Sequence, residues 1–236
     1  GVSFSPIGYR NDLIVRGGGP SENAFYLDGI GIQNISHFST QGASGGPVSI
    51  LNSDLIREIS FYTGSFPANR GGALSSVMDI SLREGNKDKQ AFKAVIGASE
   101  AGVSASGHIG KNTTYIASVR QSYLQLLFRL LGLPMLPNYI DGQFKVKTKF
   151  NTRNEITFIG LAGFDNLRLN ENPDDKGDEY LLSYLPLLKQ ETFTVGATYK
   201  HFSDKHIQTV TLSYNYLNNR SNKYLDNDDS SEENMI

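Results

Sequence analysis

Stretches in which apolar and polar residues alternate recur along the chain from residue 91 to residue 217. In the last such stretch, Val210, Leu212, Tyr214 and Tyr216 alternate with threonine, serine and asparagine. A period of two places successive side chains on opposite faces of a β-strand. The alternation predicts seven strands, at residues 91–99, 102–110, 113–121, 143–151, 154–164, 191–201 and 206–217.

The connections between these predicted strands differ in length. Tight polar turns are expected at 110–113, 151–154 and 203–206, whereas the segments 122–142 and 165–190 are long. In an up-and-down sheet every second connection lies at the same end, so short turns gather at one edge. Strands of about ten residues with this asymmetry are typical of outer-membrane barrels. The alternation alone fits a soluble β-sandwich equally well.

Composition removes several classes of protein. No apolar run approaches the roughly 20 residues of a transmembrane helix, which excludes a helical membrane protein, whereas strands that are only half apolar remain compatible with a membrane barrel. The formal net charge of −2 gives no reason to expect a nucleic-acid partner. With no cysteine there are neither disulfides nor thiolate metal sites. Lys145, Lys147 and Lys149 share one strand face, which implies water or a polar partner there.

The segment from residue 16 to residue 85 is dense in glycine and predicts repeated tight turns between short strands. Two of these turns are expected at Asp28-Gly29 and Gly71-Gly72. A polar loop covers residues 33–45 and is too long for a simple hairpin, as functional loops often are. A hydrophilic stretch at residues 85–90 separates this segment from the strand series. We therefore expect two domains, 1–86 and 87–236.

Glycine-rich motifs in this segment do not support catalysis or nucleotide binding. Ser44 lies in a sequence like a protease nucleophile loop, but Ala43 precedes it and no base–carboxylate arrangement is evident. Arg16-Gly-Gly-Gly-Pro lacks the Lys-Ser/Thr of a phosphate-binding loop. The histidines are scattered, and the acidic runs at 172–179 and 226–233 lack calcium-loop spacing. We expect no enzyme activity, no cofactor and no metal site.

Several motifs occur together in a specific order. They are Arg16-Gly, Glu22-Asn, Tyr26-Leu-Asp-Gly-Ile, Ser44-Gly-Gly-Pro, Ile59-Ser-Phe-Tyr-Thr-Gly-Ser-Phe-Pro-Ala, Arg70-Gly-Gly-Ala-Leu-Ser-Ser-Val-Met-Asp-Ile and Ser118-Val-Arg-Gln-Ser-Tyr-Leu. This series resembles the later plug domain and early barrel of TonB-dependent outer-membrane receptors, particularly the Bacteroidetes versions. The resemblance implies a mainly β protein with small α content. An α+β plug would be followed by antiparallel, up-and-down strands of a partial transmembrane barrel.

The resemblance also implies a function. We expect energised uptake of a small-molecule, glycan or peptide cargo across the outer membrane, with TonB, membrane lipid and a surface lipoprotein as further partners. A signal peptide, a TonB box and the start of the plug are not found, and such barrels have about 22 strands. The chain is therefore interpreted as a fragment whose TonB contact lies in the missing N-terminal part. The alternative is a soluble carbohydrate-binding or adhesion β-sandwich.

Candidate functional residues follow from this family interpretation. The substrate-facing residues would be His37, Phe38 and Gln41, in the loop that a plug presents to the outside. The arginines of the plug-like segment would form ion pairs with carboxylates of the plug or the barrel wall and so hold the plug in place, and they are Arg16, Arg57, Arg70 and Arg83.

Overall fold

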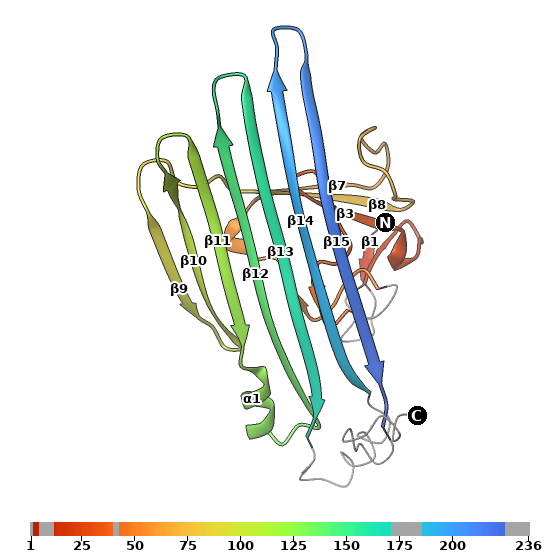
Figure 1. The fold of residues 1–236 in the computed structure, drawn as a ribbon. Coiled ribbons are helices and arrows are strands. Elements are labelled where there is room, and N and C mark those ends of the chain that lie inside the picture. The colour runs from red at the N-terminus through yellow and green to blue at the C-terminus, as the bar shows by residue number, and fades with distance from the viewer. Residues whose placement is uncertain (1, 5–11, 40–42, 171–185, 225–236) are drawn as a thin grey trace.

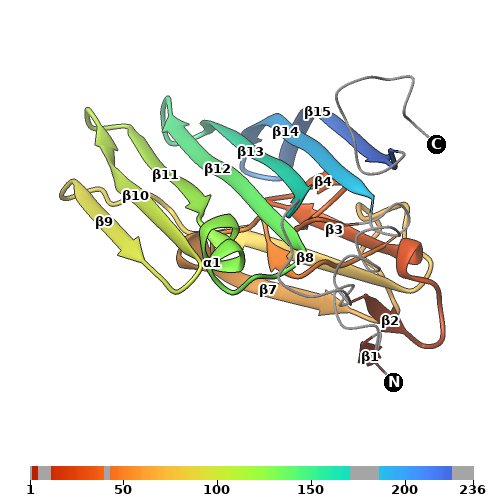
Figure 2. The ribbon, with the colours of Figure 1, turned by 90° about the horizontal axis from the view of Figure 1, so that it is seen from below.

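The computed structural model describes residues 2–4, 12–39, 43–170 and 186–224, and it has two layers (Figures 1 and 2). One layer is a seven-stranded antiparallel sheet, here called the wall. The other is the N-terminal segment, the described residues up to residue 86, which packs against one face of the wall. The expected fold class, mainly β with little helix, is confirmed. No helix within the described ranges has the length and apolar composition to span a bilayer.

All seven predicted strands of the alternating region are present, in sequential order across the wall. Their bounds are β9 Ala91–Ile96, β10 Glu100–Ile109, β11 Thr113–Ser122, β12 Met135–Lys149, β13 Asn154–Leu169, β14 Leu187–Phe202 and β15 Ile207–Asn222. The last four strands are 15 or 16 residues long, which exceeds the ten or so expected. Each extends into a segment that the sequence pattern assigned to a connection.

Short turns gather at the upper end of the wall in Figure 1, as the sequence predicts. They join β10 to β11, β12 to β13 and β14 to β15. The opposite end carries the longer connections, but the β9–β10 link at residues 97–99 is also short there. The connection expected at 122–142 is corrected: it contains helix α1, Leu124–Leu130, and the first half of β12. Six of the seven α1 residues are good helix formers, which explains the helix.

The N-terminal segment is built around a four-stranded sheet in the order β4-β3-β8-β7. Its strands are β3 Asn23–Leu27, β4 Ile30–Ile32, β7 Ile56–Tyr62 and β8 Ser76–Leu82, with β3 parallel to β8. Asp28 (φ 48°) and Gly29 (φ 85°) form the predicted turn between β3 and β4. Two positive φ values are what a two-residue hairpin of type I′ requires.

Shorter elements complete this layer. They are the paired strands β1 Val2–Phe4 and β2 Leu13–Val15, the paired strands β5 Ser36–His37 and β6 Val48–Ser49, and the 3₁₀ turns Pro20–Glu22 and Ser53–Leu55. The turn at 53–55 is capped by Asn52, whose Oδ1 accepts from the Asp54 amide at 3.0 Å.

The hydrophobic core lies between the two layers. It joins apolar residues of β3, β4, β8 and the segment 50–55 to Ile116, Ile159 and Leu161 of the wall. Wall glycines allow the close approach. A Cβ on Gly163 would lie 3.2 Å from Cδ1 of Ile50, and a Cβ on Gly196 would overlap Cδ1 of Ile30. The core therefore depends on the contact between the layers.

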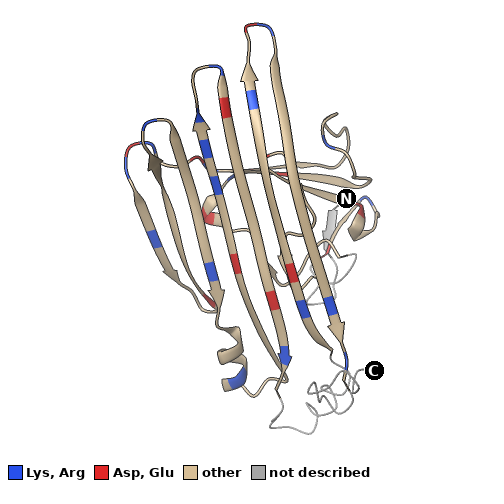
Figure 3. Ribbon diagram, in the orientation of Figure 1, with Lys and Arg blue, Asp and Glu red and all other residues tan. Residues whose placement is uncertain are grey.

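The other face of the wall is apolar and exposed. Along β12 and β13 the side chains on this face alternate with the buried ones, and Phe144, Phe158 and Phe164 are each at least 40% exposed. Further exposed apolar residues across the other strands are Phe92, Ile96, Val103, Val119, Val195, Val210, Leu212 and Tyr214. β15 carries a single charge, Arg220, near its lower end (Figure 3). The face of the wall toward the N-terminal segment thus combines buried polar and charged side chains with a few core apolar residues, whereas the opposite face is mainly apolar.

Candidate functional site

The candidate functional site is the interface between the N-terminal segment and the wall. Around the shared apolar core this interface holds two groups of charged residues. The histidine cluster lies toward the long-connection end and contains His37, Glu100, Arg120, Tyr139, Asp141 and Asp165. The lysine cluster lies toward the short-turn end and contains Asp28, Glu84, Lys145, Lys147 and Glu155.

His37 joins the N-terminal segment to two wall strands. Its side chain is fully buried; Nδ1 contacts Asp165 Oδ1 on β13, and Nε2 lies 3.1 Å from Asp141 Oδ2 on β12. The next amide, from Phe38, donates to Asp165 Oδ2 at 2.7 Å. The imidazole also stacks on Tyr139, with ring centroids 4.1 Å apart. The β5 end is thereby held by both carboxylates.

Arg120 of β11 extends the histidine cluster and reaches back to the N-terminal segment. Its Nη2 lies 2.9 Å from Asp141 Oδ2 and donates to the carbonyl oxygens of Ser49 at 2.7 Å and Ile50 at 3.0 Å. Glu100 of β10 accepts from Tyr139 Oη at 2.5 Å and lies 3.4 Å from Arg120 Nη1. Three carboxylates thus face two cations when His37 is protonated. This balance favours the charged imidazole.

The pKa of His37 reflects this surrounding. Burial alone would lower the pKa, but the hydrogen bonds and negative charges of Asp141 and Asp165 outweigh burial and raise it above 6.5. A neutral imidazole here would leave two buried carboxylates facing one ring with a single N–H donor. The contact between the layers is therefore strongest with His37 protonated.

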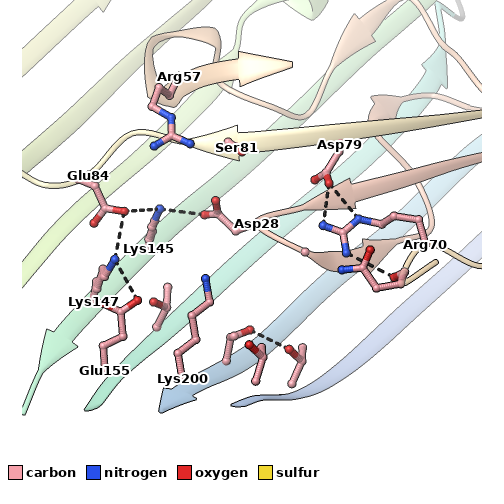
Figure 4. A pocket seen from close by; sticks show the side chains of 16 residues that line it. Asp28, Arg57, Arg70, Asp79, Ser81, Glu84, Lys145, Lys147, Glu155 and Lys200 are labelled. Carbon is pink, nitrogen blue, oxygen red and sulfur yellow. Dashed lines mark hydrogen bonds and ion pairs between the residues drawn. The ribbon is translucent and has the colours of Figure 1, made fainter. Parts of the chain in front are cut away.

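The lysine cluster makes a second set of ion pairs across the interface (Figure 4). Lys145 Nζ of β12 lies 3.1 Å from Asp28 Oδ2 and 3.1 Å from Glu84 Oε1, both in the N-terminal segment. Lys147 lies 3.7 Å from Glu84 and 3.3 Å from Glu155 of β13. Burial alone would raise the pKa of Glu84, but the charges of Lys145 and Lys147 outweigh burial and lower it. Two of the three lysines on the polar face of β12 therefore have the polar partner that the sequence implied.

A polar cavity of about 690 Å³ opens beside the lysine cluster (Figure 4). It lies between the sheet of the N-terminal segment and strands β12 to β15. Its lining has five cationic side chains and four carboxylates: Arg57, Arg70, Lys145, Lys147 and Lys200 against Asp28, Asp79, Glu84 and Glu155. The excess of one positive charge favours anions. Among the described residues, no group of three or more side chains is arranged to hold a metal ion.

The proposed substrate-facing residues lie in different surroundings. His37 is completely buried against the wall, so its side chain does not face an open vestibule; it anchors the loop. Phe38 is half-buried, and its ring meets that of Tyr139 edge-on at 6.2 Å. Gln41 lies outside the described residues. Sequence reasoning noted His37 but missed its partners, because Asp141 and Asp165 are more than 100 positions away.

Of the four arginines expected to pair with carboxylates of the plug or the wall, Arg70 alone has such an ion pair within the described residues. Arg70 pairs with Asp79 of its own sheet at 2.7 Å and lies over the ring of Tyr26. Arg83 donates to the Asp54 carbonyl oxygen. Neither Arg16 nor Arg57 has an ion pair within the described ranges. Apart from the protonated His37, the cations that cross the interface described above belong to the wall, and the lysine stripe on β12 was the sequence signal for Lys145 and Lys147.

The two predicted turns serve this arrangement differently. Asp28, in the β3–β4 turn, accepts from the Leu82 amide at 3.2 Å and reaches Lys145. Gly29 has the positive φ that the turn needs. Gly71 and Gly72 lie in the loop before β8, where Gly72 has φ 76° and the Gly71 carbonyl oxygen accepts from Tyr26 Oη at 2.7 Å. Only the first turn touches the wall.

Comparison with known proteins gives a likeness in structure. No profile of a known protein family matches the chain, and no curated protein matches it. A variant of the ferric enterobactin receptor from Pseudomonas aeruginosa, bound to enterobactin, gives a TM-score of 0.65 at 13% identity. The match covers 93% of this chain and 37% of the receptor chain. The ferripyoverdine receptor of the P. aeruginosa outer membrane, bound to ferripyoverdine, gives a TM-score of 0.61 at 14% identity. The match covers 95% of this chain and 32% of that receptor.

The siderophore receptor PirA from the same organism gives a TM-score of 0.56 at 13% identity, with 89% of this chain and 35% of that chain covered. The chain thus spans about a third of the length of these structures. Identities this low establish the fold alone: it is that of part of the plug and barrel of TonB-dependent receptors. The soluble β-sandwich alternative is not favoured.

Proposed function

We propose that this chain is part of an outer-membrane transporter that takes up a bound cargo with energy supplied through TonB. The observation that carries the proposal is the two-sided wall. Its outer face is apolar over seven strands, whereas buried charged side chains on its inner face form ion pairs with the N-terminal segment. Such a wall suits lipid on one side and a removable plug on the other.

The outward apolar side chains are the reason for assigning the outer membrane of a Gram-negative cell. Apolar residues on every strand would contact lipid, and the aromatic residues Phe193, Tyr214 and Tyr216 pack together on that face. Soluble proteins rarely leave so large a continuous apolar surface uncovered.

In this proposal residues 1–86 form a plug and residues 87–236 form the first strands of a barrel. Among the described strands, β9 and β15 each have a hydrogen-bonded neighbour on one side only, and unpaired edges in a membrane wall need partners. We therefore interpret the chain as a fragment of a longer receptor, and the resemblance of its motifs makes the Bacteroidetes type our proposal for that receptor. Its contact with TonB would be made by an N-terminal part outside this sequence.

The cargo would bind on the side of the long connections, near Phe38, which follows the end of β5. Phe38 and Gln41 are the proposed substrate-facing residues, and the contacts of His37 and of the Phe38 amide with Asp165 hold the chain at Phe38. The similar structures bind siderophores, which makes a ferric siderophore the first cargo to test; a glycan or peptide delivered by a surface lipoprotein is the second. No cofactor, enzyme activity or nucleic acid enters this function.

Conductance of the full-length protein in planar bilayers tests the proposal without knowledge of the cargo. The intact protein should be closed, because the plug fills the lumen, and a variant lacking residues 1–86 should conduct ions as an open pore. Uptake by cells, with ferric enterobactin and ferripyoverdine as probes, should stop when the proton gradient is collapsed. A protein that stays in the soluble fraction, or a plug deletion that does not conduct, would contradict the proposal.

A further inference from the structure

The polar cavity beside the lysine cluster contains two cations that the ion pairs of the interface do not use. Lys145 and Lys147 share ion pairs with three carboxylates, those of Asp28, Glu84 and Glu155, and Arg70 pairs with Asp79. All four carboxylates of the lining are thereby paired. Lys200 of β14 and Arg57 of β7 remain, with no carboxylate within 4 Å of either among the described residues.

Within the described ranges Lys200 has no carboxylate partner, although Glu155 lies directly opposite it in the β13–β14 register. The Glu155 carboxylate instead contacts Lys147, at 3.3 Å. Figure 4 shows the Lys200 ammonium group directed into the cavity, between the lysine cluster and the β3–β4 turn. A half-buried ammonium facing a partly enclosed polar space favours a negatively charged ligand.

Hydroxyl groups surround this lysine. Thr157, Thr198, Thr209 and Thr211 line the same part of the cavity, and the Thr198 and Thr211 hydroxyls lie 3.2 Å apart. One of these two hydroxyl groups donates its hydrogen to the other. The hydrogen of the accepting hydroxyl is then available for a hydrogen bond to a ligand oxygen. Ammonium and hydroxyl donors together match the oxygen atoms of a carboxylate or a phosphate.

We propose that this cavity is a binding site for an oxyanion, a carboxylate or phosphate group, with Lys200 as its principal ligand and Arg57 as a second cation at its edge. The site lies on the short-turn side of the interface, at the opposite end from the histidine cluster. A role for this site in holding the anionic groups of cargo during transport rests on the proposed transport function. Binding of a free anion at the site does not depend on that function.

Titration of the cargo-free, full-length protein with inorganic phosphate in detergent at low salt tests the site. Phosphate should bind saturably, and Lys200→Gln should weaken its affinity about tenfold, the effect of losing one charge-assisted hydrogen bond. Lys205→Gln removes the same charge from the exposed β14–β15 turn and should leave the affinity unchanged. In the unmodified protein, phosphate should also protect Lys200, but not Lys205, from acetylation detected by mass spectrometry.

Equal affinities in the two variants, or equal acetylation of Lys200 with and without phosphate, would overturn the site. The transit role has its own measurement: Lys200→Gln should slow ferric siderophore uptake several-fold and leave cargo affinity at the cell surface unchanged. Unchanged uptake would overturn that role and leave the free-anion site in place. Phosphate binding by a protein that transports nothing would uphold the site and contradict the transport function.

Discussion

His37 and Asp165 lie 128 positions apart in the sequence, yet their side chains form a hydrogen-bonded contact from which water is excluded. One residue belongs to the N-terminal segment and the other to wall strand β13. Asp141 of β12 binds the other nitrogen of the same ring. A single imidazole therefore ties three elements together, and movement of the N-terminal segment must break both contacts.

Replacing His37 with alanine should loosen the N-terminal segment. The change leaves Asp165 and Asp141 buried, each without one of its hydrogen-bond partners, and breaking a buried charge pair in this way typically costs about 3–5 kcal/mol. The Phe38 amide, which donates to Asp165, should lose protection from hydrogen exchange by a comparable free energy. His206→Ala, at an exposed turn, is the control. Equal protection in the two variants would show that His37 contributes nothing to this contact.

The contact should also weaken with rising pH. The pKa of His37 is raised above 6.5 in the folded protein, so its contribution is full below pH 6.5 and is lost as pH rises through the raised value. The other charged groups facing it are Asp141, Asp165, Arg120 and Glu100. Protection factors at Phe38, corrected for intrinsic exchange, should fall between pH 6 and pH 9. In His37→Gln this fall should disappear; its persistence would assign the titration to another group.

Loss of Lys145 should release the opposite end of the interface. Its ammonium group is nearly buried and pairs with Asp28 and Glu84, so Lys145→Met should lower the free energy of unfolding by about 3 kcal/mol. Lys149→Met, farther along the same strand face, should change it by less than about 0.5 kcal/mol. Urea unfolding measured by hydrogen exchange in β3 and β8 compares the two. Similar midpoints would argue against the ion pairs.

Acid should act on the same cluster. Because the pKa of Glu84 is lowered in the folded protein, its contribution is present above the ordinary value of 4.5 and is lost as pH falls through the lowered one. Hydrogen exchange in β8 should therefore accelerate below pH 4.5, after correction for intrinsic rates. Glu84→Gln should flatten this dependence. An unaltered acid profile in that variant would assign the effect to other carboxylates.

The sequence predicts the strands of the wall better than it predicts the contacts between the two layers. The wall strands were identified because alternation is a local signal and each strand repeats it. Their extra length was missed because Tyr139, Asp141 and Asp165 place polar groups on the inner face, where the pattern no longer separates strand from loop. The interface was only half foreseen: the lysine stripe on β12 signalled a polar partner, but no local pattern signals a pair such as His37 and Asp165.

Gly196 on the inner face of β14 should tolerate no side chain. A Cβ there would overlap Cδ1 of Ile30, a buried core residue that is packed on all sides. Gly196→Ala should therefore destabilise the contact between the layers by about 1–3 kcal/mol. Gly142→Ala is the matched strand control, because the nearest atom to its added methyl group is 3.8 Å away. Thermal unfolding in detergent distinguishes them. A midpoint as high for Gly196→Ala as for Gly142→Ala would mean that the core repacks freely.

A side chain at Gly29 should destabilise the β3–β4 turn through backbone strain and not through steric overlap with neighbouring side chains. Gly29 has φ 85°, and a Cβ there would come no closer than 3.6 Å to Arg70, so Gly29→Ala suffers only the strain of a left-handed residue, about 1–2 kcal/mol. Gly71→Ala also adds a methyl group in open space, but Gly71 has no positive φ, and that variant should keep its stability. Because Asp28 in the same turn binds Lys145, Gly29→Ala should also increase hydrogen exchange at Leu82, whose amide donates to Asp28. Unchanged exchange at Leu82, with normal folding, would separate the turn from the ion pair.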